Sequence, residues 1–377
     1  MPKKILFFIE SLEVGGAEKS LVTLLNSTKF EGYSVDLMLL KKGTFINEVP
    51  SHVNVILLEN LKTSLFKRLK FYILNRINTG ALHSSQNFWK VFQNDFEKID
   101  KKYDVAIAYS QGFSTYFIAE KTEAQKKYSW LNTDYKKAGY NIKFDLPFYE
   151  KFNKVIAVSK DAERGLVEQL KTIGKILSFQ VIKDITDQEY ILKQSLKPLQ
   201  IDFNSKAVNI VTVCRLVTEK GLFLAVEACA LLIKKNYKIN WYVIGDGSER
   251  KKLQQMIIQE NLQNSFFLLG ADSNPYPYMK ACDIYVQTSL FEGLGLTVIE
   301  ASYLNKPIVC TNFPTAYDIL VDEETGLLAE MNAESIGAQI ERLILSKDLK
   351  NLFTTNLLTL VNNDKEITLH QIAKLLV

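Results

Sequence analysis

The chain has 377 residues, more than one ordinary hydrophobic core accommodates, and its length predicts two domains. Hydrophobic residues make up 47% and charged residues 23%, a balance that is typical of a globular protein and argues against disorder. The formal net charge of +4 is small for this length, so composition gives no reason to expect nucleic acid as a partner.

The N-terminal stretch MPKKILFFIES begins with basic residues, but its apolar run ends at Glu10 after about five residues. This run is too short for a signal peptide and is typical of a first buried strand. No apolar run approaches the roughly 20 residues that span a bilayer. We therefore expect a cytoplasmic protein.

Short apolar runs alternate with helical patterns along the chain. The runs are rich in β-branched and aromatic residues and largely unalternating, which is typical of strands buried on both faces of a parallel sheet. Helical patterns over 219–234 and 247–260 complete βαβ units between them. The predicted strands cover 4–10, 33–40, 53–59, 103–110, 127–132, 153–159 and 178–183, and then 208–216, 238–245, 265–270, 283–289, 306–311 and 325–330.

This pattern predicts an α/β protein with two Rossmann-like, doubly wound domains that face a cleft. The polar, proline-containing stretch LKQSLKPLQIDFNSK marks the linker. We expect a first domain over 1–190, a linker over 191–206, a second domain over 207–350, and C-terminal helices over 351–377 that pack back toward the first domain. Parallel sheets bind ligands beyond the carboxyl ends of their strands, so the strand-to-helix loops are where function is expected.

Metal chemistry has little support in the sequence. The four cysteines form no CxxC pair, the three histidines lack zinc-ligand spacing, and no Asp-x-Asp occurs. Buried free thiols and no metal site are the prediction. The residues are Cys214, Cys229, Cys282 and Cys310, and His52, His83 and His370.

Three loops that follow predicted strands carry glycines or cations. Gly15 and Gly16 let the backbone approach a ligand after the first strand, although such a pair is as often a plain turn. Arg215 and Lys220 lie at a strand end and a helix start, where two cations suit a diphosphate; the alternative is a solvated pair. Gly245 lies in the turn VIGDGSER, which fits a ligand-side loop or an ordinary helix cap equally well.

The segment FEGLGLTVIEA, residues 291–301, places two glutamates on either side of a glycine-rich turn. Glu292 in the loop can accept hydrogen bonds from sugar hydroxyls, and Glu300 in the helix can bind a ribose diol. Gly293 and Gly295 allow a close approach of the backbone, and the helix start offers amides to a phosphate. The alternative is a helix cap and a solvated carboxylate, but amides, two carboxylates and two cations together describe a nucleotide-sugar site.

In these residues the chain resembles a retaining glycosyltransferase of family 4 with the GT-B architecture. The resemblance rests on Glu292 and Glu300 as a Glu-x7-Glu motif, on Arg215 and Lys220 in RLVTEKG, and on GGAEKSLVTLL near the N-terminus. The stretch NPYPYMKACDIYVQTSLFEGLGLTVIEA resembles the polysaccharide-building members. The resemblance covers essentially the whole chain and is strongest over 209–330.

The resemblance implies a role for each matching residue. Arg215 and Lys220 would neutralise the donor diphosphate, Glu292 would contact the donor sugar, and Glu300 would bind the ribose. The other donor-binding residues would be Gly16, Gly245 and the amides of Gly293, Leu294, Gly295, Leu296 and Thr297. Such enzymes are metal-independent because cations and a helix terminus stabilise the developing phosphate charge.

The sequence departs from the family at two places. Asn132 stands where relatives carry a histidine, in the loop WLNTDY after the fifth strand of the first half. Asp134 and Tyr135 follow as candidates for the acceptor side, although a plain polar loop explains them as well. The segment IKDITDQEYI replaces the family's interdomain NPID-like segment.

The expected function is transfer of a hexose-type sugar from a nucleotide-sugar, a UDP-sugar in first place, with no cofactor. The acceptor would be a glycan or a polyprenyl-linked saccharide, in bacterial surface polysaccharide or capsule synthesis. Two alternatives stay open: a non-catalytic GT-B partner subunit, which Asn132 motivates, and a nucleotide-sugar epimerase of similar fold.

The stretch LKTSLFKRLKFYILNRINTG, residues 61–80, has five basic residues and no acidic one. Its apolar residues recur at helical spacing, which predicts contact with an anionic membrane surface through 61–77. The separation is imperfect, because Lys62 and Arg76 fall within the apolar sector. The alternative is a helix that packs on the first domain and leaves its lysines solvated.

Overall fold

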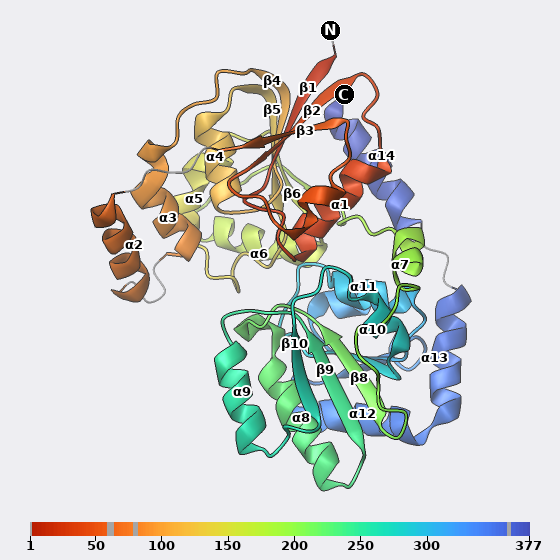
Figure 1. The fold of residues 1–377 in the computed structure, drawn as a ribbon. Helices are drawn as coiled ribbons and strands as arrows, with labels where there is room; N and C mark the ends of the chain where they lie inside the picture. The colour runs from red at the N-terminus through yellow and green to blue at the C-terminus, as the bar shows by residue number, and fades with distance from the viewer. Residues whose placement is uncertain (1, 59–63, 78–81, 360–362) are drawn as a thin grey trace. The chain divides into compact units, whose positions relative to one another are not determined.

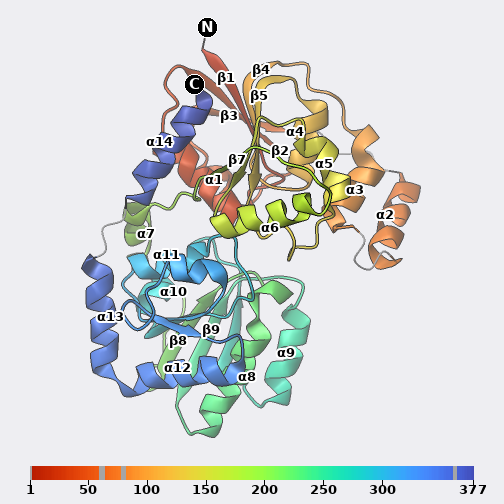
Figure 2. The same cartoon turned by 180° about the vertical axis from the view of Figure 1, so that it is seen from behind.

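Thirteen strands form two all-parallel sheets in the part of the chain that this computed structural model describes, residues 2–58, 64–77, 82–359 and 363–377. The chain divides into two units, the first made of residues 1–185 and 364–377 and the second of residues 186–363. Figures 1 and 2 show each sheet with helices on both of its faces. This confirms the prediction of two Rossmann-like domains.

The first unit holds a seven-stranded sheet in the order β3-β2-β1-β4-β5-β6-β7. Its strands are β1 (Lys3–Phe8), β2 (Tyr33–Leu39), β3 (Val53–Leu57), β4 (Tyr103–Ala108), β5 (Ala124–Leu131), β6 (Lys154–Ala157) and β7 (Phe179–Val181). Its helices are α1 (Gly16–Ser27), α2 (Leu65–Ile77), α3 (Ser84–Phe92), α4 (Phe113–Lys121), α5 (Ile142–Tyr149), α6 (Lys160–Lys171) and α14 (Asp364–Leu376), with short 3-10 turns at Thr44–Glu48 and Gln93–Asp95.

The core of the first unit explains why its strands carry no polar alternation. Residues 5–8 of β1 are fully buried, because α1 and α14 cover one face of the sheet and α3, α4 and α5 cover the other. Aromatic rings fill the second face: Phe8 stacks on Phe117 at 4.7 Å between ring centroids, and Trp89 packs edge-on against Phe113.

The second unit holds a six-stranded sheet in the order β10-β9-β8-β11-β12-β13. Its strands are β8 (Val208–Val213), β9 (Ile239–Ile244), β10 (Phe266–Gly270), β11 (Ile284–Gln287), β12 (Ile308–Thr311) and β13 (Leu327–Ala329). Its helices are α7 (Gln188–Gln194), α8 (Leu222–Lys234), α9 (Arg250–Gln259), α10 (Tyr276–Ala281), α11 (Leu296–Tyr303), α12 (Ala333–Leu345) and α13 (Lys347–Thr359), with 3-10 turns at Thr218–Lys220 and Pro314–Asp318.

All thirteen predicted strands overlap observed ones, although residue 59, the end of the third, lies outside the described residues. Most predicted strands run on into the following loop. The prediction for 208–216, for example, passes the end of β8 at Val213. The overrun has a physical cause: apolar character continues into loops that are themselves buried at the sheet edge.

The structure places the unit boundaries differently from the expected 1–190, 191–206, 207–350 and 351–377. Part of the expected linker is helix α7, which belongs to the second unit: the side-chain amide of Asn274 donates to the Gln194 carbonyl at 3.2 Å. The C-terminal helices divide between the units. In α13, Phe353 is fully buried in the second unit's core. In α14, the carbonyl oxygens of Leu375 and Leu376 accept hydrogen bonds from Tyr128 and Tyr33 of the first unit.

Candidate functional site

Two loops of the second unit leave neighbouring strands at the same edge of the sheet. One runs from the end of β8 through Arg215 and Lys220 to α8, and the other runs from the end of β11 through Glu292 to α11. β8 and β11 are paired in parallel, with Ile210 opposite Ile284. Adjacent parallel strands bring their carboxyl ends together, so residues about 72 positions apart in sequence meet here.

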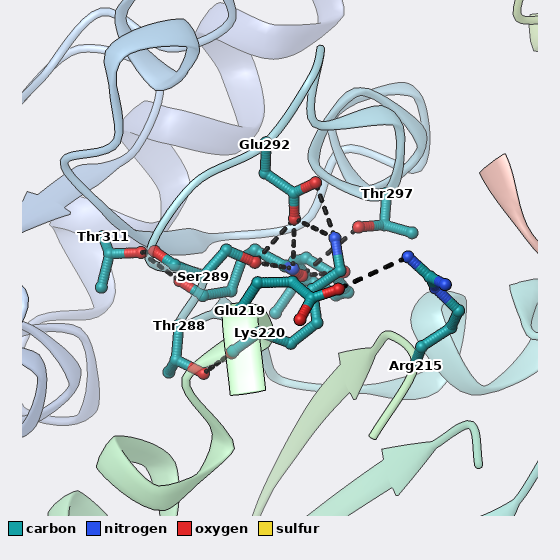
Figure 3. Close-up of polar contacts among 10 residues, drawn as sticks. Arg215, Glu219, Lys220, Thr288, Ser289, Glu292, Thr297 and Thr311 are labelled. Atoms are coloured by element: carbon teal, nitrogen blue, oxygen red, sulfur yellow. Dashed lines mark hydrogen bonds and ion pairs between the residues drawn. The ribbon is translucent and has the colours of Figure 1, made fainter. Parts of the chain in front are cut away.

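The centre of the site is an ion pair between Lys220 and Glu292 (Figure 3). The Lys220 ammonium lies 2.8 Å from one carboxylate oxygen of Glu292 and 2.7 Å from the other. Both side chains are largely buried, with 15% and 10% of their side-chain surface exposed. A pair in this environment is screened by water much less than a surface pair, and loss of one partner leaves the other charge uncompensated.

The carboxylate of Glu292 is also held from the strand side. Its Oε1 accepts a hydrogen bond from the Ser289 hydroxyl at 2.6 Å and another from the side-chain amide of Gln287 at 3.2 Å. The carbonyl of that amide accepts from Tyr285 at 2.9 Å and from Thr297 at 3.3 Å, which fixes the orientation of the amide. Ser289 and Gln287 are both buried. The position of Glu292 is therefore set by a chain of hydrogen bonds that starts inside β11.

Gly221 makes this approach of the two loops possible. It has a positive φ of 59°, and a Cβ at this position would lie 2.1 Å from the Thr288 carbonyl oxygen. The hydroxyl of Thr288 donates to the Lys220 carbonyl at 3.0 Å, and the Leu290 amide donates to the Glu219 carbonyl at 2.8 Å. Glycine is needed here because both the conformation and the closeness exclude a side chain.

Arg215, the second predicted cation, lies in a different environment. Its side chain is 61% exposed, and its guanidinium lies 3.6 Å from the Glu219 carboxylate (Figure 3). An exposed pair of this kind contributes little to stability and exchanges readily for another anion. Lys220 is thus enclosed and held by Glu292, whereas the guanidinium of Arg215 is accessible to a ligand from solvent.

Glu300, the other glutamate of the motif, is buried in α11 with 3% of its surface exposed. One of its carboxylate oxygens accepts a hydrogen bond from the Tyr276 hydroxyl at 3.2 Å. α11 begins at Leu296 and is preceded by Gly295, which has a positive φ of 84°. The first N–H groups of a helix have no partner inside the helix, so the amides of Leu296 and Thr297 at the start of α11 are suited to an anion, and the contact of Gly293 to Thr297 with a donor stays a prediction.

The two remaining glycines predicted for the donor site, Gly245 and Gly16, lie outside the pair of loops described above. A Cβ on Gly245 would lie 1.8 Å from the Cys214 carbonyl oxygen, so this glycine lets the loops after β8 and β9 pack together. Gly16 is the first residue of α1 and belongs to the first unit. The contact of Gly16 with a donor stays a prediction.

In the first unit, two of the three acceptor-side candidates, Tyr135 and Asp134, make hydrogen bonds that stabilise the folded structure. Tyr135 is fully buried, and its hydroxyl donates to the Asp145 carboxylate at 2.6 Å. Asp134 accepts hydrogen bonds from the backbone amides of Lys136 and Lys137 and so shapes the turn after β5. Both residues therefore have a structural task, which accounts for their presence without an acceptor.

Asn132 differs from these two neighbours. Its backbone amide donates to the Gln111 side chain at 2.9 Å, but neither its side-chain oxygen nor its nitrogen has a partner, although both atoms are buried. An unsatisfied buried amide costs free energy comparable to a lost hydrogen bond. Asn132 is thus the acceptor-side candidate that retains hydrogen-bonding capacity.

Two carboxyls near the end of β1 and the start of α1, the partly buried Glu10 and the buried Asp184, carry raised pKa values. Burial, together with the nearby Glu18 carboxylate, raises the pKa of Glu10 to about 7. Burial also raises the pKa of Asp184 to about 7, against a hydrogen bond from Ser20 at 2.9 Å. Asp184 lies in the segment that replaces the NPID-like pattern, where the sequence analysis identified no candidate.

Sequence reasoning missed Gln287, Ser289 and Tyr276, which position the two glutamates. A polar residue inside a run of apolar strand residues, as Gln287 is in DIYVQTS, is a signal that could have found the first of them. Cys229, Cys282 and Cys310 are buried free thiols, as predicted, whereas Cys214 is only partly buried. Burial raises the pKa of Cys229 and Cys282 to about 12. Among the described residues, no group of three or more metal-ligating side chains comes together.

The sequence of the second unit matches a known family. Residues 196–357 match the model of the family described as glycosyl transferases group 1. The solved structure of Alr3699/HepE from Anabaena in complex with UDP-glucose has the same fold, with a TM-score of 0.69 and 18% identity over 99% of this chain and 98% of that one. The chain therefore has the GT-B fold, and most of its second unit is similar to the group 1 glycosyl transferases. The predicted assignment to family 4 is narrower than this match and stays a prediction.

Two relatives in sequence are also described as glycosyltransferases. A glycosyltransferase of Methanocaldococcus jannaschii, MJ1059, is 27% identical over 172 residues, which span 45% of this chain and 42% of that protein. An N-acetylgalactosaminyltransferase of Campylobacter jejuni, whose name gives a diphospho-undecaprenol-linked sugar as acceptor, is 27% identical over 92% of this chain and 91% of its own length. The described helices of this GT-B protein include none long and apolar enough to cross a membrane.

Proposed function

We propose that this chain is a retaining glycosyltransferase that moves a hexose-type sugar from a UDP-sugar to a glycan or a polyprenyl-linked saccharide, in the synthesis of a bacterial surface polysaccharide. The observation that carries the proposal is the pairing of Lys220 with Glu292 beside Arg215, at the ligand-binding edge of a group 1 domain. UDP in the Anabaena protein and the undecaprenol-linked acceptor in the name of the C. jejuni relative support the donor and acceptor classes.

The two cations, Arg215 and Lys220, would have different roles in binding the diphosphate. Arg215 is exposed and paired with the i+4 carboxylate of Glu219, so it can exchange that partner for a phosphate oxygen and make the first contact. Lys220 is held by both oxygens of Glu292 and presents a charge whose position is already fixed. A fixed charge needs no reorganisation when negative charge develops on the leaving group, and this is what makes preorganised electrostatics effective.

The segment from Gly293 to Thr297 would supply the remaining donor contacts. Its amides lie at the start of α11, where the helix dipole favours an anion or a polar sugar oxygen. Glu292 precedes this segment and would accept hydrogen bonds from sugar hydroxyls while it holds Lys220. Glu300, fixed by Tyr276, would accept from the ribose hydroxyls. A donor aligned in this way keeps its anomeric carbon in one orientation toward the acceptor.

In the reaction, the bond between the anomeric carbon and the diphosphate oxygen breaks, and a bond from the acceptor oxygen to the same carbon forms. The electron pair of the broken bond stays on the diphosphate, beside Arg215 and Lys220. The acceptor hydroxyl loses its proton to a leaving phosphate oxygen on the same face, which gives retention of anomeric configuration. No metal is required in this scheme, because the two cations and the helix start carry the charge stabilisation.

The test is nucleotide-dependent thermal stability of the full chain and two arginine variants. We expect UDP at about 100 times its dissociation constant to stabilise the chain by roughly 2.7 kcal/mol, and GDP and ADP to do so much less. Arg215→Ala should reduce the UDP effect without lowering basal stability, because the residue is exposed. The matched control is Arg342→Ala, which removes an arginine of the same unit that is ion-paired with Glu323.

Each outcome of this test bears on the proposal. A UDP shift that is reduced in Arg215→Ala and intact in Arg342→Ala supports the donor site. An equal shift in all three chains would remove Arg215 from the site, and no shift with any nucleotide would favour the non-catalytic partner subunit. Release of UDP from UDP-sugars without an added acceptor, together with interconversion of the sugars, would favour the epimerase.

A further inference from the structure

Helix α2 lies at the outer edge of the first unit and makes its main helix contacts with α3 (Figures 1 and 2). Its inner face is anchored by Phe71, whose ring lies 5.6 Å from that of Phe88 and 5.8 Å from that of Phe92. The Lys67 ammonium pairs with Asp95 on the same face. The alternative of a helix packed on the first domain is therefore correct for this face.

The opposite face of α2 carries large apolar side chains that are exposed to solvent. Their exposed fractions run from 42% at Ile73 to 82% at Leu65. At about 100° of rotation per residue, these positions form one stripe that lies diametrically opposite Lys67, Phe71 and Leu74. The stripe consists of Leu65, Phe66, Leu69, Tyr72 and Ile73. The other exposed large apolar residues of the described chain are scattered over many elements, so this concentration on one short helix is distinctive.

Basic side chains flank the stripe. Arg68 and Lys70 lie on its two sides and are exposed, and Arg76 lies at its C-terminal end, where its guanidinium donates to the Tyr72 hydroxyl at 2.5 Å. Residues 64–77 contain no acidic residue. Lys67, which turns inward, is paired with Asp95 and is not part of this flank. Residues 61–63 and 78–80 of the predicted basic segment lie outside the described residues.

We propose that the outer face of α2 rests on the surface of an anionic lipid bilayer, with the stripe in the headgroup region and Arg68 and Lys70 against lipid phosphates. Charge complementarity commits the proposal to this occupant. A helix with an apolar face flanked by cations suits a surface that is apolar within and negative at its boundary. This inference does not depend on the proposed transferase activity, because it concerns a face of the first unit that contains none of the proposed donor residues except the distant Gly16 on α1.

Vesicle co-sedimentation with the full chain tests the proposal. The probes are vesicles of phosphatidylcholine alone and vesicles of phosphatidylcholine in which roughly a third of the lipid is phosphatidylglycerol, whose negative surface attracts basic segments. We expect binding to the anionic vesicles that weakens as salt is raised, and little binding to the neutral ones.

Two variants separate the apolar and the charged contributions. Phe66→Gln with Leu69→Gln removes apolar area from exposed positions and keeps a good helix former, and it should weaken binding by about tenfold or more. Arg68→Glu with Lys70→Glu reverses two charges and should weaken binding to anionic vesicles by at least about tenfold. The matched controls change residues of the same kind elsewhere: Ile176→Gln with Leu345→Gln, and Lys171→Glu with Lys251→Glu, which are exposed as well.

Binding that both α2 variants weaken and neither control weakens supports the proposal. Absence of binding to anionic vesicles by the native chain overturns it, and so does binding that the controls weaken as much as the α2 variants do. Light scattering on the same protein preparations, without vesicles, gives the oligomeric state. A dimer that Phe66→Gln with Leu69→Gln dissociates, without any vesicle binding, would assign the stripe to a second copy of the chain and would also overturn the proposal.

Discussion

The strand ends of the two units use polar residues in opposite ways. In the second unit, Lys220 and Glu292 come from different loops and meet each other at the sheet edge. In the first unit, both polar residues bond within the same domain: Asp134 stabilises a turn, and Tyr135 donates a hydrogen bond to a buried carboxylate. A polar loop residue is therefore better evidence of a site when its partner lies in the loop after the adjacent strand, whereas a polar residue considered by itself is as often part of the fold.

The largest expected effect is on the close approach of the two loops in the second unit. Gly221→Ala would place a Cβ 2.1 Å from the Thr288 carbonyl, at a positive φ of 59°. We expect it to lower the free energy of unfolding by about 3 kcal/mol or more, measured by chemical denaturation. The matched control is Gly270→Ala in the same unit, where φ is 94° but nothing lies within 4 Å. Its cost should be only about 1–2 kcal/mol. Equal costs would mean that the loops separate without penalty.

The second prediction compares catalytic effects between the units. Lys220→Ala should lower turnover by about 100-fold or more, equivalent to about 2.7 kcal/mol of transition-state stabilisation, because a fixed charge beside the leaving group is lost. Asp134→Ala in the first unit should leave turnover within about twofold, because its hydrogen bonds go to a turn. Initial rates of UDP release with a competent acceptor give both values. Near-normal turnover in Lys220→Ala would remove that residue from the mechanism.

A double variant sharpens this result. Lys220→Ala leaves Glu292 as a buried carboxylate without its cation, so part of the loss could come from an altered local structure. Lys220→Ala combined with Glu292→Gln removes that uncompensated charge. If the two residues act as a unit in catalysis, the double variant should lose no more activity than Lys220→Ala while it regains stability.

The third prediction concerns the pH dependence of stability that the buried carboxyl of Asp184 in the first unit causes. The pKa of Asp184 is raised from 3.8 to about 7, so the folded chain keeps a proton that the unfolded chain releases. Stability from this group is complete at pH values below about 4 and is lost as the pH rises through 7. The free energy of unfolding of the native chain should fall relative to that of Asp184→Asn, by about 2 kcal/mol between pH 5.5 and pH 7. A difference that does not change with pH between these values would show that Asp184 ionises freely.

The smallest expected effect concerns Tyr135. Tyr135→Phe removes one of the hydrogen bonds to the buried Asp145 carboxylate, which also accepts from Tyr116 and Gln86. We expect a loss of about 1–2 kcal/mol of stability and no change in KM for the acceptor. A raised KM at unchanged stability would indicate that Tyr135 contacts the acceptor. The polar residues at the strand ends of the two units would then differ less than proposed.

Much of the fold could be predicted because parallel strands buried on both faces appear in the sequence as short, mostly apolar runs. The runs that became β1, β4, β8 and β11 are apolar at nearly every position, since helices cover both faces of each sheet. Their order along the chain, with helices between them, then leaves few topologies. The unit boundaries were harder to predict. The stretch around α7 is polar and contains a proline just beyond the helix, so it has the composition of a linker although its first turns pack on the second unit.

The amino-acid sequence alone was enough to predict two parallel-sheet domains. It also predicted that Arg215, Lys220 and Glu292 follow strands in loops or at helix starts, and that Glu300 lies in the helix after Glu292. Strand order and motif spacing are local properties, so they can be predicted without coordinates. The arrangement of the side chains required coordinates: Glu292 encloses Lys220 while Arg215 is exposed, Gln287 and Ser289 hold the Glu292 carboxylate, and the apolar stripe of α2 points away from α3. The contact of Lys220 with Glu292 joins residues 72 positions apart, and Gln287 and Ser289 reach Glu292 only through the conformation of the loop after β11. Packing and loop conformation set these distances.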